Sequence, residues 1–200
     1  VDVPVTVKHR IGVDDYDSYE FLRDFVGTVA QSGCEVFLVH ARKAWLKGLS
    51  PKQNWEIPEL NYASVYQLKK DFPQLDIIIN GGVTTIEQSL AHLQHLDGVM
   101  VGREAYSNPY LLATVDQAIY GSTDPIKTRE AIADEFLHYV DNELSKGTKL
   151  NAMTRHILGL FHGMHGARLF RRHISENAFK PAAGIEVLTA ALQKTAGAVN

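Results

Sequence analysis

Short apolar runs recur along the first half of the chain, and they constrain its fold more than any other feature. Residues 36–39 and 77–79 are continuous apolar stretches without the alternation of a half-exposed strand. Strands that are buried on both faces have this pattern, and they occur in parallel sheets covered by helices. Helix signals separate the runs, so the pattern predicts successive βα units that build a parallel sheet.

Four strands are expected in the first half of the chain, at residues 3–8, 36–40, 75–79 and 98–101. Helices are expected at 17–31, 61–72, 85–93 and 109–119, with a long loop at 41–58. After the turn-forming segment 121–125 only helical periodicity remains, and it predicts helices at 126–146, 148–163, 167–177 and 185–195. This change predicts an α/β domain over residues 1–121 and an all-α domain over residues 122–200.

The composition excludes several classes of protein. The 200 residues are 45% hydrophobic and 22% charged, as in ordinary globular proteins. The net charge of −3 provides no overall basic field for a nucleic acid, so any such contact needs a local basic patch. No apolar run approaches the roughly 20 residues that span a bilayer. We therefore expect neither a membrane nor a global nucleic-acid-binding surface.

The single cysteine, Cys34, excludes an intrachain disulfide and any metal site built from a cysteine pair. This usage fits a reducing cytoplasm, and we expect no metal. Cys34 precedes its strand, away from the strand ends where chemistry is expected, so it is interpreted as a core residue. The chain also opens directly on a strand, without Met or a signal peptide, which indicates a piece of a longer protein.

Two glycine motifs follow the third and fourth strands. Asn80-Gly81-Gly82 ends one strand, and Gly102-Arg103 follows the next. Paired glycines let the backbone approach a phosphate and leave N–H groups free to donate, and arginine binds phosphate in a bidentate manner. Each motif could also be an ordinary turn. One βα unit apart, however, they match the phosphate site that recurs after the last two strands of (β/α)₈ barrels.

Two further polar residues are predicted near the ends of strands. Lys8 is expected to end the first strand, where its cation could stabilise an anionic group or simply extend to the rim. His40 is expected to end the second strand, where a neutral imidazole could contact a cofactor ring or substrate, or serve only as a rim residue.

Basic residues cluster in two places although the whole chain is acidic. The segment 43–55 holds three lysines, among them Lys52, and two tryptophans, a combination that suits RNA phosphates and bases. Arg168, Arg171 and Arg172 are spaced to share one helix face. A solvated helix face would have the same spacing, so both interpretations stay open.

Taken together, these motifs resemble those of a known family. The stretches VTVKHRIG (5–12), VHARKAW (39–45), INGG (79–82) and DGVMVGR (97–103) are similar to the second half of tRNA-dihydrouridine synthases. GLSPK (48–52) and RLFRRHISENA (168–178) point to the A subfamily. The resemblance covers essentially the whole chain.

The resemblance implies the C-terminal half of an FMN-binding (β/α)₈ TIM barrel, followed by a helical domain that binds tRNA. FMN reduced by NADPH would pass a hydride to C6 of a uracil, and a cysteine would protonate C5. By motif position, the flavin ring would contact Lys8 and His40. The FMN phosphate would contact Asn80, Gly81, Gly82, Gly102 and Arg103.

For tRNA, the same resemblance implies contacts from Lys52, Arg168 and Arg171. The family pattern also favours a basic residue at the position of Trp55. The family segment Asn-x-Gly-Cys-Pro, which supplies the catalytic cysteine, is absent from these residues, so no catalytic residue is assigned in this chain. The first four βα units are absent as well, and a barrel needs them to close.

Two other functions remain open from the sequence. One is an FMN barrel oxidoreductase acting on a small molecule, similar to dihydroorotate dehydrogenase. The other is a non-catalytic RNA-binding fragment. The arginines of the predicted helical domain argue against the first, and a flavin absorbance spectrum would separate the synthase from the second.

Overall fold

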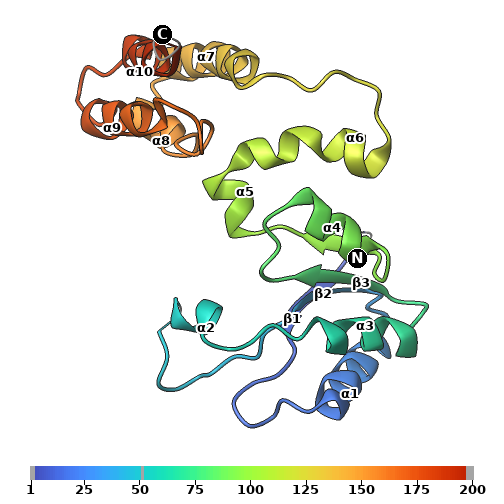
Figure 1. The fold of residues 1–200 in the computed structure, drawn as a ribbon. Coiled ribbons are helices and arrows are strands. Elements are labelled where there is room, and N and C mark those ends of the chain that lie inside the picture. Colours follow the sequence, from blue (N-terminus) through green and yellow to red (C-terminus); the bar gives the residue numbers. More distant parts are fainter. Residues whose placement is uncertain (1–2, 51, 197–200) are drawn as a thin grey trace. The chain divides into compact units, whose positions relative to one another are not determined.

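A computed structural model describes residues 3–50 and 52–196, without the side chains of Trp55 and Ala196. The chain divides into two compact units, Val1–Gly102 and Arg103–Asn200. Figure 1 shows the strands in the first of them and a succession of helices in the second.

A parallel sheet is the centre of the first unit. Its strands are β1 (Thr6–Arg10), β2 (Val36–His40), β3 (Asp76–Asn80) and β4 (Gly98–Met100), and they lie in that order. The predicted parallel four-stranded sheet is thereby confirmed. The first strand begins later than predicted because Pro4 has no N–H to donate to a ladder.

Four helices follow or connect these strands: α1 (Tyr19–Ala30), α2 (Gln53–Glu56), α3 (Tyr62–Asp71) and α4 (Ile86–Leu93). The three longer helices begin at side-chain caps. Ser18, Asn61 and Thr85 each accept a hydrogen bond from a backbone N–H of the first turn. The sequence alone therefore predicts where these three helices begin.

The two faces of the sheet differ in burial. Phe37, Val39, Ile77 and Ile79 are fully buried beneath α1 and α3, which lie on the same side of the strands (Figure 1). On the opposite face, side chains such as that of Leu38 are only partly buried. The apolar runs had predicted burial on both faces. In the described residues, one face is covered and the other is partly open.

The second unit is helical throughout its described residues. Its elements are α5 (Arg103–Ser107), the 3₁₀ helix η1 (Pro109–Thr114), α6 (Val115–Tyr120), α7 (Arg129–Ser145), α8 (Leu150–Thr154), α9 (Ala167–Asn177) and α10 (Ile185–Ala196). Helix α10 packs against α7 and α9. Phe161, Phe170 and Leu188 are buried at the centre of this unit.

The predicted helix at 148–163 is much shorter in the structure, where only Leu150–Thr154 is α-helical. Residues 155–166 form turns and bends instead, and Gly163 and Gly166, with φ of 76° and 78° in the left-handed region, lie in the last of these before α9. The 109–119 helix is likewise divided between η1 and α6.

The structure divides after Gly102, whereas the sequence pattern changes near residue 121. Contacts within the second unit explain this placement of α5 and η1. The Tyr106 hydroxyl lies 3.1 Å from His156 Nδ1, and the Tyr110 ring lies 3.8 Å from the Arg129 guanidinium carbon. These contacts join the residues after β4 to the helices, and no periodicity reveals them.

Candidate functional site

The carboxyl ends of the strands form one edge of the sheet. Arg10, His40, Asn80 and Met100 lie opposite one another in register at this edge. His40 ends its strand as predicted, and Asn80 ends β3, one residue beyond the predicted strand. Lys8 does not, because β1 continues to Arg10 and places Lys8 in the middle of the strand.

The turn after β3 has no room for side chains. Gly81 and Gly82 have φ of 113° and 75°, values that favour glycine. A Cβ on Gly82 would lie 2.6 Å from Leu60 Cδ1 and 2.8 Å from the Tyr62 hydroxyl, and one on Gly81 would lie 3.3 Å from the His40 ring. The backbone itself therefore forms the surface of the turn.

This turn and Gly102 present unpaired hydrogen-bond donors. The N–H groups of Gly82 and Gly102 make no hydrogen bond with any residue that the structure describes. A Cβ on Gly102 would lie 3.8 Å from Asn80 Nδ2, and that amide donates to the Met100 carbonyl at 2.8 Å. We call Gly81, Gly82 and Gly102 the glycine edge; such open backbone donors fit a phosphate.

His40 lies next to the glycine edge. Its Nδ1 accepts the backbone N–H of Arg42 at 3.3 Å, so Nε2 carries the proton in the neutral ring. Nε2 lies 3.3 Å from the Cβ position of Gly81. The donating side of the imidazole therefore faces the glycine turn.

Lys8 lies on the partly open face of the sheet, opposite Leu38. Its ammonium makes no hydrogen bond or ion pair within the described part of the chain. An exposed, unpaired ammonium on this face could stabilise an anion bound above the strands.

Two arginines that the sequence did not single out hold the loop after β2. Arg10 donates to the carbonyl oxygens of Lys43 at 2.8 Å and Asn54 at 2.9 Å, and Arg42 donates to that of Pro58. Burial, with a contribution from Arg42, lowers the pKa of Arg10. These contacts join residues far apart in sequence, so no local signal could have predicted them.

The lysines of this loop differ in whether they form ion pairs. Lys43 Nζ lies 2.5 Å from the Asp17 carboxylate and 4.3 Å from the centre of the Trp45 ring, so its charge is used within the fold. Lys52 is exposed and has no ion pair among the described residues. The position of Trp55 belongs to α2, but its side chain lies outside the described residues.

Helix α2 was missed within the predicted loop, although a signal existed. The Ser50 N–H donates to Gln53 Oε1 at 2.8 Å, and the Gln53 N–H donates to Ser50 Oγ at 3.3 Å. The spacing Ser-x-x-Gln favours such a reciprocal pair, which often marks the start of a helix. Helix α2 itself begins at Gln53, with Lys52 directly before it.

Helix α9 separates its arginines from its core residues. Phe170 and Ile174 are buried, while Arg168 is exposed and Arg171 is half-buried. Leu169, next to Phe170 in the sequence, is 50% exposed because it lies one position off the buried stripe.

The arginines of α9 also differ in pairing. Arg172 Nε lies 2.8 Å from Glu176 Oε1, whereas Arg168 and Arg171 have no ion pair with described residues. We call Arg168 and Arg171 the arginine face. The spacing places all three arginines on α9, but only the structure distinguishes the paired Arg172 from the two without an ion pair among the described residues.

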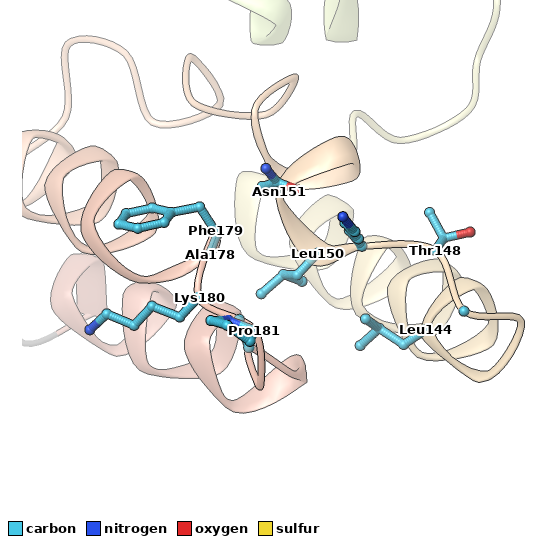
Figure 2. Close-up of a pocket in the computed structure, with 11 residues that line it drawn as sticks. Leu144, Thr148, Leu150, Asn151, Ala178, Phe179, Lys180 and Pro181 are labelled. Atoms are coloured by element: carbon cyan, nitrogen blue, oxygen red, sulfur yellow. The ribbon is translucent and has the colours of Figure 1, made fainter.

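A pocket of about 490 Å³ lies elsewhere in the second unit, between the end of α7, the start of α8 and the segment after α9 (Figure 2). Leu144 and Leu150 line one side and Pro181 the other. In Figure 2 the Lys180 side chain extends away from these leucines, and its Nζ donates to Asn177 Oδ1 at 2.7 Å. None of the predicted site residues lines this pocket.

Arg103 begins α5 and is the first residue of the second unit. Its participation in a phosphate site with the glycine edge stays a prediction. Cys34 is buried, and its Sγ lies 3.7 Å from the Val5 carbonyl oxygen, as expected of a core residue.

The described helices include none that is long and apolar enough to cross a membrane. Residues 3–50 and 52–196 also contain no group of three or more His, Cys, Asp or Glu side chains that could hold a metal ion.

Comparison with known proteins agrees with the motifs at the strand ends. The model of the family described as "Dihydrouridine synthase (Dus)" matches residues 1–196. The chain belongs to the dihydrouridine synthase family. The tRNA-dihydrouridine(20/20a) synthase of Vibrio cholerae is 63% identical over 195 residues, which are 97% of this chain and 60% of that protein.

A second member of the family, the tRNA-dihydrouridine(20/20a) synthase of Escherichia coli K12, is 58% identical over 197 residues. That alignment covers 98% of this chain and 57% of the relative. The chain therefore spans about three fifths of the length of the dihydrouridine synthases that it matches.

Proposed function

We propose that this chain supplies the phosphate side of an FMN site and the RNA-binding helices of a tRNA-dihydrouridine synthase. The observation that supports this most is the glycine edge. Two unpaired backbone N–H groups, on Gly82 and Gly102, lie beside Asn80 and His40 at the carboxyl end of a parallel sheet, in a member of this family.

The open face of the sheet supports an incomplete barrel. Leu38 and Ile78 are apolar but only partly buried there, and the relatives are longer than this chain. In the proposal, residues 1–121 are the second half of a (β/α)₈ barrel whose other βα units cover this face and close the sheet. Residues 122–200 then form the helical tRNA-binding part.

The residues at the edge of the sheet suit the parts of FMN. Asn80, the glycine edge and Arg103 would hold the phosphate, and the backbone donors would do so without needing flexible side chains. His40 would donate Nε2–H to the flavin ring, and Lys8 would place its positive charge beside it. When bound, FMN would transfer two electrons from NADPH to uracil, as a hydride to C6, while C5 receives a proton.

The proton donor is not assigned in this chain, because Cys34 is buried in the core of the first unit. The tRNA would contact Lys52, Arg168 and Arg171, all unpaired among the described residues. The names of the relatives specify positions 20 and 20a, and we propose the same uridines here, in the cytoplasm.

The test uses the full-length protein. Flavin absorbance that survives dialysis, and NADPH-dependent gain of two hydrogens at uridine 20 or 20a of unmodified tRNA, are the expected results. Two outcomes would overturn the proposal. Flavoprotein that reduces a small molecule but not tRNA favours a dihydroorotate dehydrogenase-like oxidoreductase. Colourless protein that binds tRNA favours a non-catalytic RNA-binding module.

A further inference from the structure

Tyr62 contacts the glycine edge from a fixed position. It is the first residue of α3, directly after the cap residue Asn61, whose N–H donates to the Ala41 carbonyl at 2.8 Å. The start of the helix is thereby attached to the end of β2. From there the Tyr62 hydroxyl donates to the Gly81 carbonyl at 2.8 Å.

This hydrogen bond determines the direction of a neighbouring donor. The peptide bond between Gly81 and Gly82 is trans, so its C=O and N–H point in opposite directions. Because Tyr62 holds the carbonyl, the Gly82 N–H must point away from Tyr62. That N–H is one of the two donors of the glycine edge that no described residue accepts.

The aromatic ring of Tyr62 is itself held in place. The His92 ring packs edge-on against it, with centroids 4.6 Å apart. His92 is 6% exposed and lies 2.7 Å, through Nδ1, from the Tyr66 hydroxyl. Burial raises the pKa of Tyr62, so its hydroxyl keeps its proton at neutral pH and acts as the donor.

We propose that Tyr62 is a positioning residue for the cofactor phosphate, which it does not touch. Its hydroxyl sets the orientation of the Gly81–Gly82 peptide so that the Gly82 N–H faces the phosphate. This rests on the proposed function, because it presumes that the glycine edge binds FMN. In the proposal the flavin ring contacts His40 and Lys8 instead, so riboflavin should bind independently of the Tyr62 hydroxyl.

The substitution Tyr62→Phe, made in the full-length protein, removes the hydroxyl and keeps the ring. Dissociation constants are measured for FMN and for riboflavin, which lacks the phosphate. The ratio of FMN to riboflavin affinity should fall about three- to ten-fold, the effect of one hydrogen bond, while riboflavin affinity stays unchanged. In wild type, the Gly82 amide resonance should shift on adding FMN but not riboflavin.

Tyr66→Phe is the matched control. It removes a hydroxyl from the same helix and the same aromatic cluster, but that hydroxyl contacts His92 and not the glycine edge. The ratio of FMN to riboflavin affinity in this variant should equal that of wild type. Equal losses for both ligands in Tyr62→Phe would mean a general structural role and overturn the inference, as would an unchanged ratio.

Measurements on the wild-type protein distinguish failure of the positioning role from failure of the proposed cofactor site. If wild type prefers FMN to riboflavin and Tyr62→Phe retains the full preference, only the positioning role is wrong. If wild type shows no preference for FMN, the phosphate site fails, and the role of Tyr62 fails with it.

Discussion

The glycine edge of the first unit and the arginine face of the second present positive charge in opposite ways. At the glycine edge, the donors are backbone N–H groups of Gly82 and Gly102. The direction of the Gly82 N–H is set by a left-handed turn and by the hydrogen bond from Tyr62 to the Gly81 carbonyl. At the arginine face, the donors are guanidinium groups at the ends of long side chains on α9.

This difference teaches what each surface can recognise. Backbone donors lose little conformational entropy on binding, so they suit a small group held in one position. Arginine side chains adapt to phosphates at variable spacing, and their attraction depends on salt. The first surface therefore suits a cofactor phosphate and the second an RNA backbone. Mutations should affect the two surfaces in different ways.

The largest effect is expected at the glycine edge. Gly82→Ala forces a Cβ into the left-handed region, at a cost of about 1–2 kcal/mol, and against Leu60 and Tyr62. With the turn displaced, a charge-assisted bond worth roughly 1.5–3 kcal/mol is also lost. The backbone strain lowers stability, whereas the lost bond should lower FMN affinity, measured by fluorescence titration, roughly 10- to 100-fold.

Gly33→Ala is the control for this substitution. Gly33 has a similar φ of 91°, but a Cβ there meets nothing within 4 Å. It precedes β2, at the opposite end of the sheet. The substitution Gly33→Ala should lower the melting temperature through backbone strain and leave FMN affinity unchanged. Equal losses of FMN affinity in the two variants would show that the glycine edge has no special role.

The next effect is expected at the arginine face. The double variant Arg168→Ala and Arg171→Ala should weaken tRNA binding about ten-fold or more and flatten the plot of log affinity against log salt by roughly two units. FMN content should not change. Arg172→Ala provides the comparison, because that arginine is paired with Glu176 and should change the slope by less than one unit.

Titrations of wild type and both variants at several salt concentrations measure these slopes. Parallel lines of equal affinity would leave α9 without a role in RNA binding. The small-molecule oxidoreductase would then be the better interpretation, and the contrast between the two surfaces would disappear.

A smaller effect would show whether the first unit also uses a side-chain cation. Lys8→Met removes an unpaired ammonium from the open face of the sheet. A reduced flavin carries more negative charge, so losing this cation should lower the flavin reduction potential, by on the order of 30 mV for the two-electron couple. Lys52→Met is the control, and it should weaken tRNA binding without changing the potential. Equal potentials in Lys8→Met and wild type would remove Lys8 from the site.

The smallest effect concerns acid stability of the first unit. Burial is the main cause that lowers the pKa of His9, whose ring packs against Phe25, and of His92. The folded pKa then lies below the unfolded value of about 6.5, so the unfolded chain binds more protons in between. The free energy of unfolding is therefore unaffected by these histidines above the unfolded pKa, and it decreases as the pH falls below that value.

Thermal melting at pH 7.5 and pH 5.5 measures this loss, which should amount to a few degrees. His9→Asn keeps a donor for the Arg10 carbonyl, which the His9 ring contacts at 2.9 Å, but cannot titrate. The melting temperature of this variant should fall less on acidification than that of wild type. An identical pH dependence would contradict the assignment to His9.

Local patterns identified much of the fold and of the candidate site. The apolar runs placed β2 and β3, and the glycines marked the turn after β3, because side-chain burial and backbone φ act within a few residues. The helix-like segment at 148–163 was misleading, since only Leu150–Thr154 is α-helical and turns follow it. The loop contacts of Arg10 span more than thirty residues, so no pattern could indicate them.

By itself, the sequence determined the order of the βα units, the glycine turn and the spacing of the arginines on α9. The tertiary structure decided which groups can act. It engages Lys43 with Asp17 and Arg172 with Glu176, and it leaves Arg168 unpaired among the described residues. It also brings Tyr62 to the Gly81 carbonyl. Propensities and periodicities are properties of neighbouring residues, whereas the pairing of a charge or the direction of a peptide depends on side chains that only folding brings together.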